Sequence, residues 1–529
     1  MKKSFPLIYY LLFGAGSAVI IALLLIFWLY YPTNRLNSDM ASELVLASHL
    51  AESNQLLSRE WYYSTDLRLI HIQLIASILF KVTNSWQSVR FFTIFILMVL
   101  CGASFLFLGK SIKLNKLGIL FGEFLLLIPY SYTQFTVMQY GGGYYPHIIL
   151  TFILLGCFFR REKIYLLLWV IISFVFGLNG IRCYMTLFLP LLCSEFVINL
   201  LYNRKKGFGL STLLSDSSFI RACIGAFSAG IGITINEVVL RHYYTFAQNS
   251  LFYRSFKESE NTLFDLFGNS LMGILEVLGY KYNIKVFSFY GILNGCIMLG
   301  CIALTVILFQ SGRRWIQGTG ENCNVKLTLT FVLFWGVLAH IFIFVFTTQQ
   351  YSSRYWILVL VILIPLACFP LDNIKSELSF QKIGILFVFF CSLCIGAFST
   401  ITYMTYKENE SRCHISQYLQ SKGIDLAYST FWNANVITEL TNGNVKMIPL
   451  TSDMHLYEWL TKKDFYLEDR KECSTAIVLL ETSEIDQLEI SVLSGAGSEI
   501  YRDENYVIYS FDKEVLETSV GMPSQLYSF

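Results

Sequence analysis

Long runs of apolar residues, separated by short polar segments, dominate the first 406 positions of the chain. Eleven of these runs approach the roughly 20 residues that a helix needs to cross a bilayer. The pattern therefore predicts a mostly α-helical, polytopic membrane protein. The predicted spans cover residues 7–31, 89–109, 117–138, 145–159, 164–180, 183–202, 219–239, 287–309, 327–346, 355–371 and 383–405.

Three segments between the predicted spans repeat apolar residues at helical spacing but also carry charged residues. They cover residues 39–52, 67–82 and 258–280. An apolar stripe on an otherwise polar helix favours a position in the membrane interface. We therefore expect interfacial helices, two of them in the loop that follows the first span.

After residue 406 the pattern changes to short apolar runs separated by polar turns. Helices are predicted over 407–420, 433–440 and 483–493, and strands over 425–428, 445–448, 476–480, 499–501 and 506–511, the last two as a hairpin. About 120 residues are enough for an independent core. We expect two domains: a transmembrane body over 1–405 and a small α/β domain over 406–529.

Composition and charge separate the same two parts. The 529 residues are 55% hydrophobic and 14% charged, whereas a soluble protein has about 25% charged residues. Residues 1–406 hold 29 Lys and Arg against 17 Asp and Glu, a net +12, and residues 407–529 hold 10 against 20, a net −10. An acidic tail argues against a nucleic-acid partner. Most of the 13 cysteines lie in apolar runs, and pairing of Cys413 with Cys473 is left open.

Clusters of basic residues fall in alternate loops between the spans. They are Lys2/Lys3, Lys110/Lys113/Lys116, Arg160/Arg161/Lys163, Arg204/Lys205/Lys206, Arg313/Arg314 and Lys375/Lys382. Cytoplasmic loops collect Lys and Arg. We therefore expect a multi-pass protein of the cell membrane, with its N-terminus in the cytoplasm and its C-terminal domain outside.

Two carboxylates, Asp39 and Glu43, follow the first span. At positions i and i+4 they share one face of a helix, so both can meet one substrate or one metal ion. A carboxylate is a suitable general base for an acceptor hydroxyl. Asn37 and Ser38 also read as a helix start, so Asp39 as an N-terminal helix acid is the structural alternative. For Glu43, the alternative to a catalytic role is that it is an ordinary helix residue whose side chain is solvated.

Cations near the expected outer ends of the spans are candidates for binding a phosphate. Tyr351 and Arg354 lie at the start of a span, and both are candidates for binding the donor. The Arg354 guanidinium can hold a phosphate with two hydrogen bonds. The structural alternative is an arginine that reaches to lipid head groups. Arg182 lies at another outer turn, after glycines that allow close backbone approach.

Three further candidates lie in the same expected outer region. Arg68 and His71 are predicted one turn apart on the second interfacial helix, where a surface pair of Arg68 with Asp66 is an equal alternative. His147 follows the triple-glycine turn 141–143 at the start of a span. No Gly-Lys-Ser/Thr follows that turn, so it is not a P-loop. No Cys/His pattern indicates zinc.

Together these residues resemble the GT-C-fold glycosyltransferases, a superfamily that includes protein O-mannosyltransferases and the aminoarabinose transferases of lipid A. The resemblance covers about residues 1–405: a first span, an outer loop opening with an acid, and two interfacial helices. It implies that Asp39 is the base of the first outer loop and that Arg354 grips the phosphate of a polyprenyl-phosphate sugar. The tandem acids of some members are absent, which leaves the role of Glu43 open.

The resemblance implies transfer of a sugar from a polyprenyl-phosphate donor to a cell-envelope glycan or lipid acceptor, outside the cytoplasmic membrane. Inversion at the sugar carbon needs only one base and is favoured over retention. The chemistry requires no cofactor, although a divalent metal is compatible with it. The alternatives are a flippase or transporter for lipid-linked sugars, and a polysaccharide polymerase or ligase. Transporters usually show internal repeats and mid-membrane charges, and no such repeat or charged pair is evident here.

Overall fold

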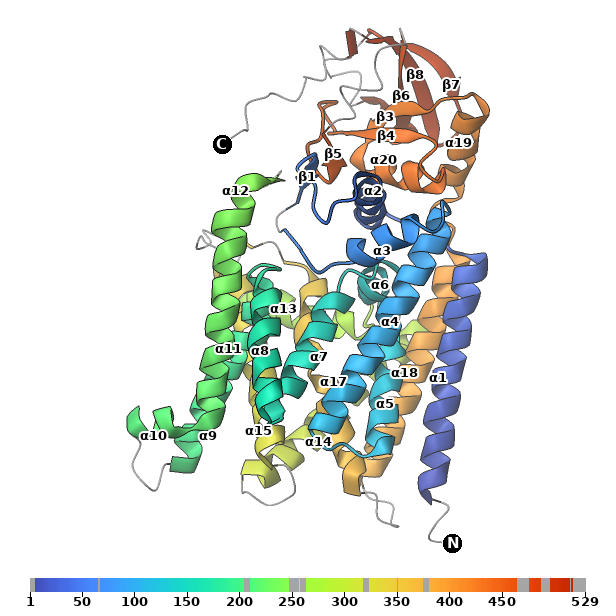
Figure 1. Cartoon of the computed structure of the whole chain (residues 1–529). Helices are drawn as coiled ribbons and strands as arrows, with labels where there is room; N and C mark the ends of the chain where they lie inside the picture. Colours follow the sequence, from blue (N-terminus) through green and yellow to red (C-terminus); the bar gives the residue numbers. More distant parts are fainter. Residues whose placement is uncertain are drawn as a thin grey trace. The chain divides into compact units, whose positions relative to one another are not determined.

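The computed structural model describes residues 5–64, 67–203, 210–246, 256, 263–316, 323–349, 351–373, 380–463, 475–486, 495–513 and 515–516. The chain forms two compact units (Figure 1). The first unit comprises Met1–Phe27, Ile94–Asn236 and Ser250–Thr402, and the second comprises Trp28–Thr93, Glu237–Asn249 and Tyr403–Phe529.

The first unit is helical. Four of its elements, α1, α4, η3 and α18, continue into the second unit. The elements are α1 (Phe5–Tyr30), α4 (Trp86–Ser111), α5 (Lys116–Leu127), α6 (Tyr132–Phe135), η1 (Thr136–Tyr140), α7 (Tyr145–Phe159), α8 (Lys163–Gly177), η2 (Tyr184–Phe188), α9 (Leu189–Asn203), α10 (Leu210–Ser215), α11 (Ser217–Thr234), η3 (Ile235–Leu240), α13 (Leu263–Val277), α14 (Phe289–Ile316), α15 (Cys323–Phe346), η5 (Ser353–Tyr355), α16 (Trp356–Leu360), α17 (Leu363–Cys368), η6 (Phe369–Asn373) and α18 (Phe380–Thr405). Neighbouring long helices such as α8 and α11 lie side by side (Figure 1).

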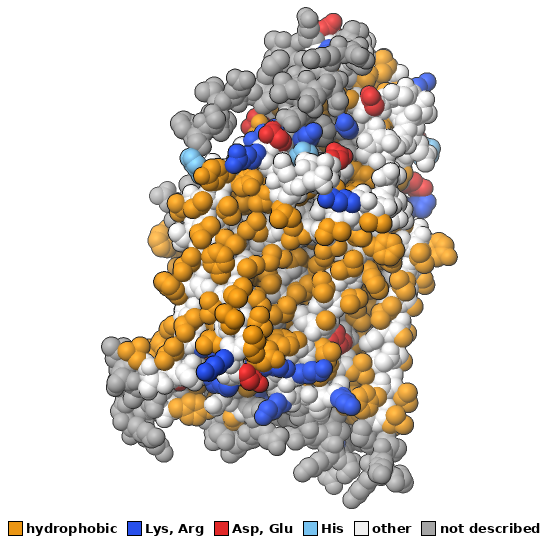
Figure 2. All heavy atoms as spheres, viewed as in Figure 1, with side chains coloured by type: hydrophobic (Ala, Val, Ile, Leu, Met, Phe, Trp, Pro, Cys, Tyr) orange, Lys and Arg blue, Asp and Glu red, His pale blue; other side chains and the backbone are white. Residues whose placement is uncertain are grey.

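The helices confirm a multi-pass membrane protein. Among the described residues, 7 helices are long and apolar enough to cross a membrane, or up to 9 if each of two bent helix pairs is one span. The predicted number of eleven is therefore not reached by this measure. On the face in Figure 2 the hydrophobic side chains form a broad band, with Lys and Arg side chains gathered along its edge. Such a band is what a lipid-facing surface requires.

The prediction of one continuous span over 117–138 is wrong. Helix α5 ends at Leu127, and Ile128 is extended, with ψ 123°. A proline disfavours helical backbone in the residue before it, and Pro129 follows Ile128. The chain then restarts as α6 with Ser131 as its N-cap, and the helix over 132–140 meets α7 at a bend of 79°.

The second unit combines helices with two small sheets. Its elements are α2 (Ser38–Ser53), β1 (Trp61–Tyr63), α3 (Gln73–Phe80), α12 (Arg241–Tyr243), β2 (Thr245–Phe246), α19 (Glu410–Ser421), β3 (Leu426–Thr430), α20 (Phe431–Leu440), β4 (Lys446–Leu450), β5 (Thr461–Lys462), β6 (Thr475–Glu481), η8 (Thr482–Glu484), β7 (Ser498–Arg502) and β8 (Tyr506–Asp512). The larger sheet has the order β4-β3-β6-β8-β7. Strands β4, β3 and β6 are parallel, and β8 and β7 form the predicted antiparallel hairpin.

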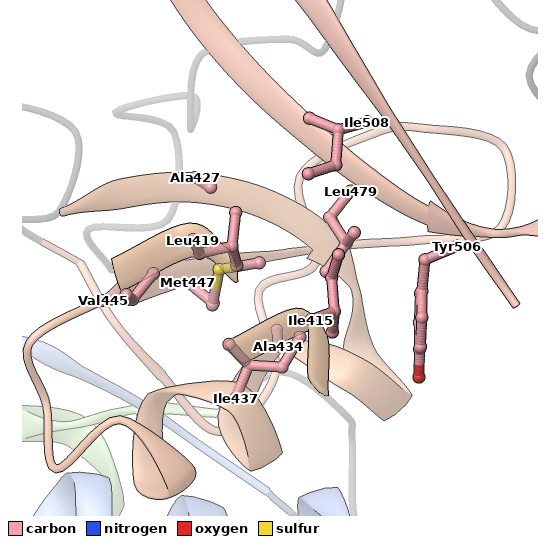
Figure 3. Packing of buried hydrophobic residues seen from close by; sticks show 10 residues of the cluster. All are labelled: Ile415, Leu419, Ala427, Ala434, Ile437, Val445, Met447, Leu479, Tyr506 and Ile508. Atoms are coloured by element: carbon pink, nitrogen blue, oxygen red, sulfur yellow. The ribbon is translucent and has the colours of Figure 1, made fainter. Parts of the chain in front are cut away.

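The larger sheet is buried on both faces. Alternate residues of its strands point to opposite sides, so Ala427 and Leu479 pack with α19 and α20 (Figure 3), while Tyr428 and Val478 join the core of the other face. This arrangement confirms the predicted helices and strands of the tail, apart from the helix over 483–493, which lies mostly outside the described residues. Cys473 also lies outside them.

The interfacial segments are helical over shorter ranges than predicted. Helix α2 matches 39–52 closely, and α13 covers part of 258–280. The segment 67–82 is helical only over α3, so Arg68 and His71 lie before the helix rather than on it. Asp66 lies outside the described residues.

A small three-stranded sheet joins segments that are far apart in sequence. Strand β1 pairs in parallel with β2 and antiparallel with β5. The Lys463 ammonium also donates to the Thr245 hydroxyl at 2.5 Å. Residues of the first loop, of the segment near 245 and of the tail therefore fold as one unit.

A buried ion pair fixes α2, α20 and the start of α4 to one another. Arg90 donates to both carboxylate oxygens of Glu439 at 2.6 Å and to the Met40 carbonyl at 2.9 Å. The two side chains are 2% and 7% exposed. Burial raises the pKa of the Glu439 carboxyl, and the Arg90 guanidinium opposes that rise. Removing one partner would leave the other as an uncompensated buried charge.

We expect Glu439→Gln to lower the free energy of unfolding by about 3–5 kcal/mol, because it leaves Arg90 buried without its counter-charge. A denaturant titration of the purified protein in detergent measures this loss as a lower unfolding midpoint. The control is Glu410→Gln, which removes one partner of the exposed pair with Lys407 and should change little. Equal midpoints for wild type and Glu439→Gln would contradict the assignment.

Candidate functional site

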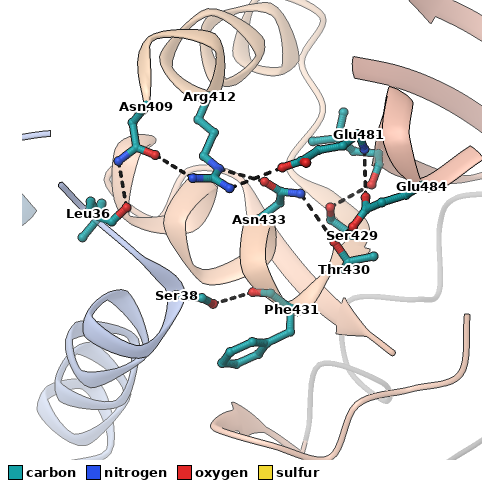
Figure 4. Close-up of polar contacts among 11 residues, drawn as sticks. Leu36, Ser38, Asn409, Arg412, Ser429, Thr430, Phe431, Asn433, Glu481 and Glu484 are labelled. Carbon is teal, nitrogen blue, oxygen red and sulfur yellow. Dashed lines mark hydrogen bonds and ion pairs between the residues drawn. The ribbon is translucent and has the colours of Figure 1, made fainter. Parts of the chain in front are cut away.

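Asp39 lies in the first turn of α2, in the second unit, and its side chain is exposed. The helix starts here because the Asn37 side chain accepts a hydrogen bond from the Met40 N–H at 3.1 Å. The Ser38 hydroxyl donates to the Phe431 carbonyl of α20 (Figure 4). Asn37 therefore caps the helix, and Asp39 lies two residues later in its first turn.

Glu43 belongs to a chain of polar contacts that ends at Arg68. Its Oε2 lies 3.1 Å from His71 Nδ1, and Arg68 Nη1 lies 3.2 Å from His71 Nε2. Since an arginine can only donate, Nε2 accepts and Nδ1–H donates, which assigns the neutral Nδ1–H tautomer of His71. The Gln73 amide donates to the Arg68 carbonyl at 2.9 Å and holds the turn in place.

The structure thus brings together three predicted site residues, Glu43, Arg68 and His71. From the sequence, the two carboxylates are expected to act together because Asp39 lies one helical turn before Glu43 on α2. The Glu43 carboxylate instead contacts His71. Burial alone would raise the pKa of Glu43, but the hydrogen bond from His71 and the charges of Arg68 and Arg90 lower it below its ordinary value of 4.5. Glu43 is therefore held as a carboxylate.

Arg182 and Arg354, both in the first unit, converge on one aromatic ring. The Arg182 guanidinium carbon lies 5.2 Å from the centroid of the Tyr355 ring, and that of Arg354 lies 5.6 Å from the same centroid. Arg182 also lies 5.8 Å from the ring centroid of Tyr144. Aromatic faces attract guanidinium groups, so the two rings hold two positive charges in one region. Such a region attracts an anion with several oxygens, such as a phosphate.

Glycine turns and π-helical segments position these residues. Gly142 and Gly180 adopt φ +72° and +93°, a backbone region that L side chains rarely occupy. The first turn leads to Tyr144, and the second leads to Arg182. A π-helical segment, η1, precedes the first turn, and another, η2, follows Arg182. Segments of this kind occur often at functional sites.

His147 supports the Arg182 turn. Its Nε2 lies 2.9 Å from the Thr186 hydroxyl, and that hydroxyl donates to the Arg182 carbonyl at 3.0 Å. The Thr186 oxygen thus accepts from His147, which then carries its proton on Nε2. In this arrangement His147 positions the backbone of Arg182.

Tyr351 packs closely on α13. A Cβ at Gly273 would lie 1.4 Å from the Tyr351 hydroxyl, so only glycine allows this approach. Burial, together with the charge of Glu276, raises the pKa of Tyr351 to about 12. Glu276 itself accepts a hydrogen bond at 2.7 Å from the hydroxyl of Ser353. Ser353 directly precedes Arg354 in the sequence.

Sequence reasoning missed Glu276, Tyr144 and Tyr355. Glu276 lies in the predicted amphipathic segment 258–280, where nothing distinguishes it from a solvated helix residue. Tyr144 follows a glycine turn, and Tyr355 lies at the start of a predicted span. Tyrosines are common at both kinds of position near a membrane interface. In the described part of the chain, no group of three or more His, Cys, Asp or Glu residues could hold a metal ion.

Comparisons with known proteins support the fold. No protein-family model matches the sequence, and no curated protein matches it. Among solved structures, ArnT of Cupriavidus metallidurans bound to undecaprenyl phosphate matches with a TM-score of 0.58 and 9% identity, over 94% of this chain and 98% of that chain. The apo state of the same protein matches with a TM-score of 0.56 and 8% identity, over 95% and 99%. ArnT is an aminoarabinose transferase with the GT-C fold.

This chain therefore has the GT-C fold that its sequence resembles. The match covers 94% of this chain, which is more than residues 1–405, on which the sequence resemblance depends. At such low identity the likeness concerns the fold, and the chemistry depends on the residues of this chain.

We expect Glu43→Gln to lower the thermal stability at neutral pH, because the variant keeps a hydrogen-bond acceptor for His71 but loses the charge. A carboxylate with a lowered pKa in the folded state stabilises the protein above its unfolded pKa, and this contribution disappears as the pH falls through the folded value. The difference in melting temperature between wild type and Glu43→Gln should thus shrink below pH 4.5. A difference that stays constant from pH 7 to pH 3 would contradict this.

Proposed function

We propose that this protein is a membrane glycosyltransferase that moves a sugar from a polyprenyl-phosphate donor to a cell-envelope acceptor at the outer face of the cytoplasmic membrane. The observation that carries the proposal is the convergence of Arg182 and Arg354 on the Tyr355 ring, within a chain that has the ArnT fold. ArnT was solved with undecaprenyl phosphate, a ligand of the same chemical class.

In the proposed reaction, the acceptor hydroxyl attacks the anomeric carbon of the donor sugar. The new C–O bond forms as the bond from that carbon to the phosphate oxygen breaks, and the phosphate leaves on the lipid with the electron pair. The Asp39 carboxylate takes the hydroxyl proton. Arg354 and Arg182 stabilise the charge that develops on the phosphate. One base and no protein nucleophile lead to inversion.

The remaining candidates take supporting roles. The contacts among Glu43, His71 and Arg68 hold the loop after α2, and Arg68 adds positive charge. His147 positions the backbone of Arg182. Tyr351 anchors the segment that precedes Arg354. Arginine supplies the charge that phosphate departure needs, so the mechanism requires no cofactor. A divalent metal remains compatible with it, and adding EDTA to the assay tests this point.

An apolar cavity in the first unit is suited to the lipid part of the donor. Its volume is about 150 Å³. It is lined almost wholly by hydrophobic side chains, including Leu125, Met138, Ile297, Leu360 and Ile364. Isoprenoid chains are apolar and bind by burial of hydrocarbon surface. We propose that isoprene units of the donor occupy this cavity.

We expect Asp39→Asn to reduce sugar transfer by about 10²–10⁴-fold, the usual contribution of general base catalysis, with donor binding unchanged. The assay incubates the purified protein in nanodiscs with a panel of polyprenyl-phosphate sugars and envelope polymers, followed by mass spectrometry. The control is Glu52→Gln, which changes an exposed carboxylate on the same helix. Full transfer by Asp39→Asn would refute the base assignment. Movement of lipid without any transfer by wild type would favour a flippase.

We expect Arg354→Ala and Arg182→Ala to weaken donor binding by about tenfold or more, since a hydrogen bond to a charged group contributes about 1.5–3 kcal/mol. Arg354→Lys should keep only part of the donor affinity, because an ammonium group cannot bind two phosphate oxygens in a planar fork as a guanidinium does. Titration with a polyprenyl phosphate measures the affinity, and Arg59→Ala, an exposed arginine of the first loop, is the control. Unchanged affinity in both alanine variants would exclude these residues from the phosphate site.

A further inference from the structure

Four aromatic side chains of the tail form a connected group, here called the aromatic platform: Phe431, Trp432, Tyr457 and Trp459. The Phe431 and Tyr457 ring centroids are 5.4 Å apart, with planes at 86°. The Tyr457 and Trp459 centroids are 6.2 Å apart, and their planes differ by only 14°. Trp432 adjoins Phe431 at 5.3 Å. Tyr457 and Trp459 therefore present nearly parallel ring faces.

The aromatic platform lies beside Asp39. The Ser38 hydroxyl, one residue before Asp39, donates to the carbonyl of Phe431 (Figure 4). Burial raises the pKa of Tyr457, and the negative charge of Asp39 raises it further. All these residues belong to the second unit, so the Asp39 carboxylate and the rings lie near one another within one compact body.

Specific contacts hold the segment that carries two of the rings. Tyr457 N–H donates to the Pro449 carbonyl at 2.9 Å, and the carboxylate of Glu458 accepts from the Tyr62 hydroxyl at 3.2 Å. Glu458 lies between Tyr457 and Trp459 in the sequence and anchors the segment to β1. The rings are thus preorganised, which reduces the entropy cost of binding a ligand.

The aromatic platform is not closed by the described protein. Trp432 is 59% exposed, and Tyr457 and Trp459 are partly exposed. A sugar ring has an apolar face of C–H groups and a polar edge of hydroxyls. Aromatic rings bind the apolar face, and an adjacent carboxylate accepts a hydrogen bond from a hydroxyl at the edge. Rings and a carboxylate side by side match both parts of such a ligand.

We propose that the aromatic platform binds a pyranose ring of the acceptor and directs one of its hydroxyls to Asp39, so that the acceptor is a glycan. This inference rests on the proposed function, because it gives Asp39 the role of base. Aromatic side chains also gather at membrane interfaces. Asp39 is exposed, and the carboxylate of Asp453, in the same segment as Tyr457, is 71% exposed. Exposed carboxylates disfavour insertion of this surface into lipid.

The test measures binding of soluble oligosaccharides to the full-length protein in nanodiscs by saturation-transfer NMR. The probes are cello-, chito-, manno- and malto-oligosaccharides. At least one of them should bind wild type, with the apolar face of a sugar ring receiving the strongest transfer. Trp432→Ala and Trp459→Ala should each weaken binding by about tenfold, at the upper end of what aromatic contacts contribute. Trp459→Phe should keep most of the affinity.

The matched control is Tyr30→Ala, which removes a 73% exposed aromatic side chain of α1 and should leave binding unchanged. Absence of binding by every probe, or equal binding by wild type and both alanine variants, would overturn the proposal. The fluorescence of Trp432 is the difference between wild type and Trp432→Phe. Quenching of this fluorescence by brominated lipids would also overturn the proposal, because it would place this surface in the membrane.

Asp39→Asn separates this proposal from the proposed function. Binding of an oligosaccharide to the aromatic platform needs no proton transfer, so Asp39→Asn should keep it within about threefold, the weight of a single modest hydrogen bond. If Asp39→Asn binds the sugar but transfers as fast as wild type, the base assignment fails and the glycan site stands. If Asp39→Asn loses transfer while Trp432→Ala and Trp459→Ala bind sugar normally, the glycan site fails alone.

Discussion

The buried ion pair of Arg90 with Glu439 is the constraint on which the second unit depends. One guanidinium satisfies a carboxylate of α20 and the Met40 carbonyl of α2 at the same time. Because neither charge can stay buried alone at an acceptable cost, the start of α4, α2 and α20 are tied together. Asp39 directly precedes Met40, so the same contact determines where the proposed base lies.

The two units carry two different electrostatic arrangements. Around Glu43, a neutral imidazole links a carboxylate to a guanidinium through short contacts. Around Tyr355 two guanidinium groups of like charge lie near one ring, whose electron-rich face lowers the cost of bringing them together. The first arrangement stabilises local structure, and the second creates a region that attracts an anion.

Local patterns predicted much of the fold. Apolar runs gave most of the membrane helices, and alternating residues in the tail gave the strands around Ala427, Leu479 and Ile508, since period and turn signals act over a few residues. The span over 117–138 failed because Pro129 interrupts an apolar run that looks continuous to a hydropathy window. The helix over 67–82 was too long for a similar reason: apolar spacing continues through residues that form a turn.

The sequence by itself determined the membrane class, the two-part charge pattern and the identity of the acids and arginines worth testing, because these depend on residue type and short-range order. Only the tertiary structure decided that Glu43 contacts His71, that Arg182 and Arg354 share the Tyr355 ring, and that Ser38, next to Asp39, contacts Phe431. These partners are separated by tens to hundreds of positions. Side chains so far apart meet through packing of whole elements, and no local period records which of them will touch.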